Sequence, residues 1–190
     1  MQGALFAGTA AEALPGFHYH PEFLSAAEEG ELLERIGALP WQQAQYPEWH
    51  ARRRIVSFGG RYDFTLQALS DAPPIPAFLL PLRERVAALA GLSPARIHHA
   101  MLAEYAPGTP LGWHRDVPEF EVIMGVSLPG RARLRFRAWP PRPEARTALA
   151  LGLAPRSAYV LRDEARWQWQ HAVSPTRELR YSITFRTRSS

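Results

Sequence analysis

Two closely spaced residues near the middle of the chain, and one histidine far along it, could together form a metal centre. His114 and Asp116 stand two positions apart, so on an extended strand both side chains point to the same face of the sheet. An imidazole and a carboxylate that converge on one point are two of the three ligands of a facial iron triad. His171 is the one histidine that follows His114 in the sequence, and we assign it as the third ligand. Such a metal keeps three coordination positions open for a co-substrate and oxygen.

The His-x-Asp spacing alone is weak evidence, because a solvated loop pair explains it as well. A second pattern begins nine residues after His171, where Arg180 and Arg186 stand six positions apart. On a strand these arginines share one face with Ser182 and Thr184. A strand that faces a core rarely points two guanidinium groups inward unless anions meet them. This second pattern therefore predicts a binding site for a dicarboxylic acid.

Several conspicuous segments occur in order along the second half of the chain. They are Tyr105-Ala-Pro-Gly-x-x-Leu111, His114-x-Asp116, His171 and Arg180-x-Ser-x-Thr-Phe-Arg186. Taken together they resemble the AlkB family of iron(II)/2-oxoglutarate dioxygenases, most strongly over residues 97–188 and more weakly from about residue 16. The resemblance implies a double-stranded β-helix with helices packed on one side. It also implies that the protein uses iron(II), 2-oxoglutarate as co-substrate, and O2.

The same resemblance implies roles for the residues around the metal. Arg180 would pair with the distal carboxylate of 2-oxoglutarate, assisted by the phenol of Tyr105. Arg186 would reach the carboxylate near the metal and steady Asp116. The other predicted co-substrate residues are Leu111, Ser182 and Thr184.

The chain departs from the family pattern at two positions near the co-substrate. Well-studied members of the family carry asparagine at the positions that match Ala103 and Ser182. Ser182 can still donate a hydrogen bond, but Ala103 cannot. These departures predict either weaker 2-oxoglutarate binding or another branch of the family.

Residues 41–64 combine aromatic and basic side chains, and in the resemblance they lie where nucleotide-recognition loops lie. Arg53, Phe58-Gly59 and Tyr62 resemble the arginine, aromatic-glycine and tyrosine of those loops. Aromatic faces can stack on an extruded base while arginines hold its flanking phosphates. We therefore assign Arg53, Phe58 and Tyr62 to substrate binding. The alternative is that Phe58 belongs to the core and the arginines are solvated.

Two tryptophans precede His171 at alternate positions. On a strand Trp167 and Trp169 would share the face of His171. They would then either wall the metal pocket or close the end of the barrel. We assign Trp169 to substrate binding.

Residues 131–138 alternate arginine with alanine, leucine or phenylalanine, which predicts a half-buried strand. The arginines on its polar face are Arg131, Arg133, Arg135 and Arg137. Like charges on one strand face repel each other unless a polyanion, or acidic neighbours such as Glu144 or Glu164, offset them. We favour a solvated face over a nucleic-acid contact.

The remaining pattern predicts a mostly β fold with flanking helices, arranged as an antiparallel jelly roll of the cupin-like, double-stranded β-helix type. Ser25 and Glu28 form a capping box for a helix over about 26–38, and Gly91 ends a second helix over about 76–90. The strands that follow are predicted at 97–105, 122–128, 131–138, 148–153, 157–161 and 177–188, with a loop through 162–164.

Length and composition indicate one domain, since 190 residues suffice for a full core. Residues 1–15 show no period and predict an N-terminal arm. The domain would span 16–190, with the early helices and the recognition segment in 16–96 and the β-helix core in 97–188. The sequence has no cysteine, which excludes disulfides and thiolate ligands, and shows neither a signal peptide nor an apolar run of membrane-spanning length. We expect a cytoplasmic monomer.

The net charge does not identify the class of binding partner. The net charge is +4 and every basic residue is arginine, which either a codon bias or a phosphate-binding face explains. The predicted activity is oxidative demethylation of alkylated bases in DNA or RNA, a repair-type reaction. The alternatives are the same oxygenase chemistry on a protein side chain or a small metabolite, and a non-catalytic binding module that kept the fold. The intact metal and arginine residues argue against the binding module.

Overall fold

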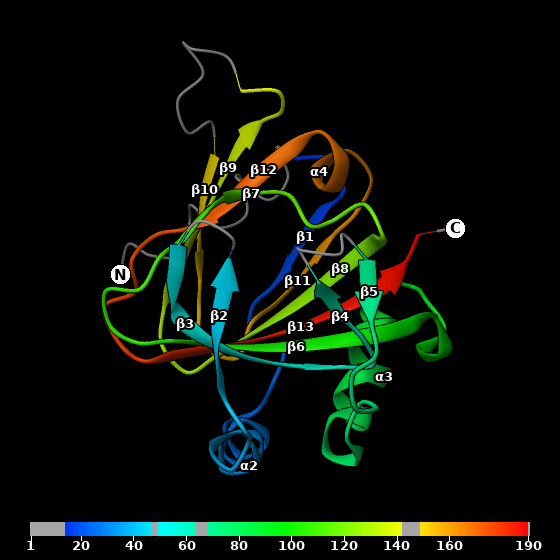
Figure 1. The fold of residues 1–190 in the computed structure, drawn as a ribbon, viewed down its shortest axis with the longest axis vertical. Helices are drawn as coiled ribbons and strands as arrows, with labels where there is room; N and C mark the ends of the chain where they lie inside the picture. The colour runs from blue at the N-terminus through cyan, green and yellow to red at the C-terminus, as the bar shows by residue number, and fades with distance from the viewer. Residues whose placement is uncertain (1–13, 47–48, 64–67, 142–148, 190) are drawn as a thin grey trace.

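The computed structural model describes residues 14–46, 49–63, 68–141 and 149–189, with the backbone alone at 45–46, 49–52, 61–63 and 68–70. Two antiparallel sheets form the body of the molecule (Figure 1). The predicted arm, residues 1–15, lies outside the described residues apart from its last two. No described helix is long and apolar enough to cross a membrane.

The larger sheet has seven strands within the described part of the chain, in the order β1-β11-β8-β13-β6-β3-β2. Their bounds are β1 (Phe17–His20), β11 (Ala158–Leu161), β8 (Phe120–Leu128), β13 (Arg180–Arg188), β6 (Ile97–Tyr105), β3 (Trp49–Phe58) and β2 (Gln42–Tyr46). The smaller sheet has the order β10-β9-β12-β7, with β10 (Leu149–Leu153), β9 (Ala132–Ala138), β12 (Trp169–Val173) and β7 (Leu111–His114). The strands β4 (Arg61–Asp63) and β5 (Ala68–Ser70) pair antiparallel in a separate two-stranded sheet. The predicted mostly β, jelly-roll class is confirmed.

Two helices cover the outer face of the larger sheet (Figure 1). The helix α2 (Ala26–Gly37) begins at the predicted capping box, in which Ser25 and Glu28 bond each other's backbone. The helix α3 (Leu80–Leu89) follows the 3-10 turn η1 (Ala77–Leu79), and η2 (Pro94–Arg96) leads into β6. Apolar side chains of both helices form one buried cluster with β6, β8 and β13. Because one face of the larger sheet is closed by helices, its other face is the one that meets the smaller sheet.

A second buried cluster fills the space between the two sheets. It joins Leu134 and Phe136 of β9 to Ile123 of β8, and Phe17 of β1 packs edge-to-face on Phe136 at 5.0 Å between ring centroids. This cluster fixes the separation of the sheets. The functional cavity lies beside it, where polar side chains replace the apolar ones.

The loop predicted through 162–164 is a short helix instead, α4 (Asp163–Trp167). Asp163 and Glu164 lie in its first turn, where carboxylates interact favourably with the helix dipole. Arg166 is 2% exposed and donates hydrogen bonds to the carbonyls of Asp116, Val117 and Phe120. These long-range bonds explain why the local sequence did not reveal the helix.

Glu104 of β6 joins three strands on the helix-covered side of the larger sheet. Arg54 of β3 donates two hydrogen bonds to its carboxylate, each of 2.7 Å, and the Tyr181 hydroxyl of β13 donates a third of 3.1 Å. The hydrogen bonds from Arg54 hold the pKa of Glu104 below its usual value, although partial burial acts the other way.

Glu104→Gln is therefore expected to lower the free energy of unfolding by about 1 kcal/mol at neutral pH, since Arg54 is half exposed. The folded-state pKa is depressed, so the contribution is present above the unfolded-state pKa and is lost as pH falls through the folded-state value. Chemical denaturation at pH 7 and pH 3 measures the difference, which should shrink at the lower pH. Glu121→Gln, at the exposed pair with Arg96, is the control and should change stability less. An equal loss at both pH values would contradict the ionic assignment.

Candidate active site

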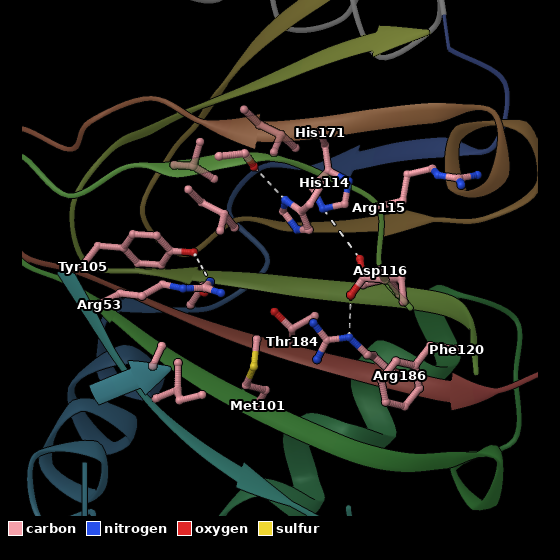
Figure 2. A pocket seen from close by; sticks show the side chains of 18 of the residues that line it. Arg53, Met101, Tyr105, His114, Arg115, Asp116, Phe120, His171, Thr184 and Arg186 are labelled. Carbon is pink, nitrogen blue, oxygen red and sulfur yellow. Dashed lines mark hydrogen bonds and ion pairs between the residues drawn. The ribbon is translucent and has the colours of Figure 1, made fainter. Parts of the chain in front are cut away.

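A cavity of about 370 Å³ lies between the two sheets. It is lined by β3, β6, β8 and β13 of the larger sheet and by β7 and β12 of the smaller one. Figure 2 shows polar side chains from these strands converging on it, with apolar side chains between them. A mostly apolar cavity with a few convergent polar groups is the usual form of a ligand site.

The predicted metal ligands meet at one end of this cavity. Pairing of β12 with β7 sets His171 opposite His114, and their ring centroids are 4.2 Å apart. The Nε2 of His171 lies 3.6 Å from Oδ2 of Asp116, and the potential ligand atoms of all three residues lie within 4.8 Å of one another (Figure 2). The structure thus brings together three residues that the sequence separates by up to 57 positions.

The spacing predicted that His114 and Asp116 lie on one extended strand, but Asp116 lies outside it. The strand β7 ends at His114 because its pairing with β12 ends at His171, and Asp116 lies in the loop that follows. Long-range contacts hold it instead: Nε of Arg186 donates to its Oδ1 at 2.8 Å, and Arg166 binds its main-chain carbonyl at 3.0 Å. The carboxylate reaches the histidines through these arginines rather than through strand alternation.

Burial sets the protonation states of the three residues. It lowers the pKa of His114 and lowers the pKa of His171 to about 3, so both rings are neutral at physiological pH. Burial alone would raise the pKa of Asp116, but the Arg186 guanidinium holds the pKa of its carboxyl well below its usual range. The site therefore presents two lone pairs and one anion without having to release a proton.

This donor set fits iron(II). The Nδ1 of His114 lies 2.9 Å from the Gly112 carbonyl, which can only accept, so Nδ1 carries the proton and Nε2 is left as the ligand atom. Two neutral imidazoles and one carboxylate are the facial set of non-haem iron(II) oxygenases. Iron held by such a set activates O2 for oxidation of a substrate and decarboxylation of a bound 2-oxo acid.

A buried cation without a carboxylate partner marks the co-substrate end of the cavity. Arg180 is 2% exposed, and its Nε donates to the Ser127 hydroxyl at 3.0 Å. Its Nη1 is buried and has no hydrogen-bond partner among the described residues. A guanidinium in this state requires an anion. Arg180, Ser182, Thr184 and Arg186 of β13 all line the cavity, as their alternation predicted, and so does Leu111.

Arg180 and Arg53 flank the phenol of Tyr105. The Arg180 guanidinium lies 4.9 Å from the centroid of the ring, and Nη1 of Arg53 donates to the hydroxyl at 3.3 Å. Burial alone would raise the pKa of Tyr105, but the two guanidinium groups lower it. Arg53 lies in the cavity, next to the residue assigned to the co-substrate, and its assignment to substrate binding stays a prediction.

His99 supports the site and was not among the residues predicted for it. It stands opposite Arg186 in the pairing of β6 with β13, and Nη1 of Arg186 donates to its Nδ1 at 3.2 Å. Burial and the neighbouring Arg186 lower the pKa of His99 to about 3, so the ring is a neutral acceptor. Its odd position, shared with Met101 and Tyr105, was the available signal for a cavity-facing side chain.

Two predicted substrate residues do not line the cavity, and a third cannot be placed. Phe58 is buried in the cluster beneath the helices, because Arg53, Ile55 and Ser57 take the opposite face of β3. Trp169 packs against the cluster between the sheets and donates from Nε1 to Glu164 at 3.3 Å. The side chain of Tyr62 lies outside the described residues.

Trp167 does not share a strand face with His171 as predicted. It belongs to α4, which breaks the alternation that would have placed both indoles beside His171, and its side chain is 39% exposed. Phe58 therefore lies in the core, as the alternative had it, and neither tryptophan is among the described residues that line the cavity.

Comparison with known proteins agrees with the geometry. The sequence model of the 2OG-Fe(II) oxygenase superfamily matches residues 16–186. An uncharacterised protein of Acanthamoeba polyphaga mimivirus is 26% identical over 189 residues, covering 93% of this chain and 86% of its own length. ALKBH6 of Danio rerio, named as a probable RNA/DNA demethylase, is 27% identical over 173 residues, which cover 85% of this chain and 70% of the relative.

A third relative is longer than this chain. The ALKBH8 homolog of Arabidopsis thaliana, named as an alkylated DNA repair protein, is 27% identical over 182 residues, covering 84% of this chain but only 51% of the relative. The solved structure of OsALKBH1 superimposes with a TM-score of 0.73, covering 91% of this chain and 97% of its own, and at 15% identity it supports the fold alone. The chain belongs to the 2OG-Fe(II) oxygenase superfamily and is an AlkB-like dioxygenase whose cofactors are Fe(II), 2-oxoglutarate and O2.

Proposed function

We propose that this protein is an oxidative demethylase of alkylated bases in DNA or RNA. The observation that carries the proposal is a cavity that joins the His114, Asp116 and His171 set to the buried guanidinium of Arg180, whose Nη1 has no hydrogen-bond partner among the described residues. The names of the Danio rerio and Arabidopsis thaliana relatives support nucleic acid as the substrate class.

Different side chains of the cavity bind 2-oxoglutarate and hold the metal ligands in place. Arg180 and Tyr105 hold the distal carboxylate of 2-oxoglutarate, and Arg186 keeps Asp116 turned toward the histidines. Apolar groups such as Met101 and Val173 exclude water, so that the oxidising power is spent on substrate rather than on solvent. No side chain needs to act as a general base in this scheme.

The product chemistry follows from the carbon that is oxidised. One oxygen atom of O2 enters the succinate formed from 2-oxoglutarate, together with loss of CO2, and the other enters a C–H bond of the N-methyl group. The resulting hemiaminal breaks its C–N bond and releases formaldehyde, and the base recovers its N–H group. Succinate and formaldehyde therefore form in equal amounts when the two half-reactions are coupled.

The charge of the cavity supports an anionic substrate. Arg53, Arg115, Arg180 and Arg186 line it, whereas Asp116 is the one carboxylate among its described lining residues. One dicarboxylate co-substrate does not offset four guanidinium groups and a divalent metal. A phosphodiester chain at the mouth of the cavity would offset more of this charge.

The test is an anaerobic titration with iron(II) and 2-oxoglutarate, followed by oxygen and a methylated single-stranded oligonucleotide, with succinate and formaldehyde both measured. We expect both products to rise with the oligonucleotide and to stay low with the unmethylated control strand. Succinate without formaldehyde would contradict the nucleic-acid substrate and favour a protein side chain or a small metabolite. If neither product formed with the metal loaded, the chain would be a binding module.

A further inference from the structure

The smaller sheet presents its outer face without a covering helix among the described elements. The helices α2 and α3 pack on the opposite side of the molecule, against the larger sheet (Figure 1). On β9 the even-numbered residues Leu134 and Phe136 point into the core between the sheets. The odd-numbered residues therefore point outward, and they are the predicted arginine row.

This outward row is basic along its length and ends in an indole. Arg133, Arg135 and Arg137 follow one another on the outer face of β9, and Trp139 is the first residue after the strand ends at Ala138. Their spacing along the strand is roughly 7 Å, so the row spans roughly 20 Å. That step is close to the distance between successive phosphates of an extended single strand.

The neighbours of the row leave its charge exposed to a partner. Across β9, the register sets Gly152 beside Arg133 and Ala150 beside Arg135, and small residues cannot cover the guanidinium groups. None of the three arginines forms an ion pair within the described part of the chain. Of the two acidic neighbours considered from the sequence, Glu164 accepts from Trp169 instead, and Glu144 lies outside the described residues.

Two of the arginines in this row also contact neighbouring side chains, which a simply solvated set of arginines would not do. Arg135 and Arg137 both lie over the ring of Trp113 of β7, at 4.9 and 4.7 Å from the centroid. Arg137 also donates from Nε to Gln170 of β12 at 2.7 Å. Stacking fixes the arginines without neutralising them, so the expectation of a plain solvated face accounts for only part of what is seen.

Two exposed tryptophans connect this face to the mouth of the active-site cavity. Trp139 is 41% exposed and Trp167 is 39% exposed, although large apolar side chains are normally buried. Arg115 joins them, because its guanidinium lies 4.7 Å from the centroid of the Trp139 ring and its Nη1 donates to the Trp167 carbonyl at 3.0 Å. Arg115 also lines the cavity and stands next to Asp116 in the sequence.

We infer that this face is a docking surface for a single-stranded nucleic acid, and this inference rests on the function proposed above. The arginines of β9 bind successive phosphates, and Trp139 stacks on a base that flanks the target. The strand then passes Arg115 and delivers its alkylated base to the cavity. A basic track combined with an aromatic platform is how proteins bind single strands without reading their sequence. A duplex, whose bases are already stacked on each other, would leave the exposed indole without a role.

The experiment measures binding of a fluorescent, methylated single-stranded oligonucleotide at several salt concentrations, with manganese(II) and 2-oxoglutarate present. The double variant Arg133→Gln/Arg137→Gln is expected to lower the slope of log affinity against log salt by about 1.4, at about 0.7 per lost phosphate contact on a single strand. Trp139→Ala is expected to weaken binding roughly tenfold and to leave the salt slope unchanged, since stacking releases no counterions.

Matched controls separate the surface from general effects of charge and hydrophobicity. Arg35→Gln removes an exposed arginine of α2, on the opposite side of the molecule, and Leu179→Ala removes an apolar side chain that is 43% exposed. Both should bind as the wild type does. Thermal unfolding midpoints of all four variants check that each one is folded, and Arg133→Gln alone, at an exposed arginine, replaces the double variant if that one is unfolded.

The outcomes distinguish the surface from the proposed function. If the wild type binds and demethylates the strand while the arginine and tryptophan variants match it, the docking surface is wrong and the function stands. Tighter binding of a duplex than of a single strand, with no effect of Trp139→Ala, would also overturn the surface. If the wild type neither binds the strand nor releases formaldehyde from it, the proposed function itself fails.

Discussion

Asp116→Asn is expected to abolish iron binding and turnover in a protein that still folds. The carboxylate is the only anionic member of the metal-binding set, so its replacement by an amide removes the charge that attracts a divalent cation. The loss of metal affinity should exceed the ~10- to 100-fold that is typical when only a supporting partner of a ligand is changed. Anaerobic titration followed by measurement of bound metal per chain, with succinate release as the activity, provides the test.

The amide is chosen because Arg186 needs an acceptor. Its Nε donates to Oδ1 of Asp116, and Asp116→Ala would leave a buried guanidinium unpaired at a cost of about 3–5 kcal/mol. The asparagine oxygen can still accept this bond, so loss of activity cannot be attributed to unfolding. Glu121→Gln, at an exposed ion pair, should retain full metal content and turnover. Wild-type metal content in Asp116→Asn would show that the metal is held elsewhere.

Arg180→Met is expected to abolish the stabilisation of the protein by 2-oxoglutarate without destabilising the ligand-free protein. The guanidinium is buried, and its Nη1 has no partner among the described residues, so an apolar side chain of similar length removes a desolvated charge. With the co-substrate present, the same change removes a buried charge pair worth about 2–5 kcal/mol, or roughly 30-fold or more in affinity.

Thermal unfolding with saturating manganese(II) measures both effects, since a ligand that binds only the folded state stabilises it by an amount that grows with the logarithm of the ligand concentration over Kd. The wild type should gain stability as 2-oxoglutarate is added, and Arg180→Met should gain little. Arg180→Lys keeps the charge but not the planar fork, and should recover part of the gain. The same 2-oxoglutarate dependence in wild type and Arg180→Met would move the carboxylate site elsewhere in the cavity.

Alternation on a strand was the most reliable guide from sequence to site. Arg180, Ser182, Thr184 and Arg186 were placed on one face by their spacing, and all four line the cavity. The strand that carries them is central in the larger sheet, paired on both sides, so no local distortion shifts its faces over these residues. The capping box at Ser25 and Glu28 was also predicted correctly, because it depends only on residues within one turn of a helix.

The same rule failed where the backbone leaves the strand. Asp116 lies beyond the end of β7, and Trp167 lies in α4, so alternation gave the wrong reason for the first and the wrong face for the second. Arg166 decides both local structures, since it binds the carbonyls of the loop that carries Asp116 from within α4. The residues near Asp116 and Trp167 in the sequence do not allow this contact to be predicted.

Phe58 shows a different limit. Which face of its strand meets the cavity depends on which side of the sheet the helices cover. The neighbours Arg53 and Ser57 face the cavity, so Phe58, one step out of phase, enters the core. A basic and aromatic composition alone could not separate these two environments.

Residue types and spacings alone predicted the metal-binding residues, the paired arginines of β13 and the family to which they belong. Those features depend on residue identity and on short spacings, which the chain carries locally. The fold was needed to show how the carboxylate is held, that His99 and Arg166 support the site, and which aromatic residues reach solvent. Each of these depends on contacts between strands and loops that are distant in the sequence, and packing of the two sheets and the helices settles them.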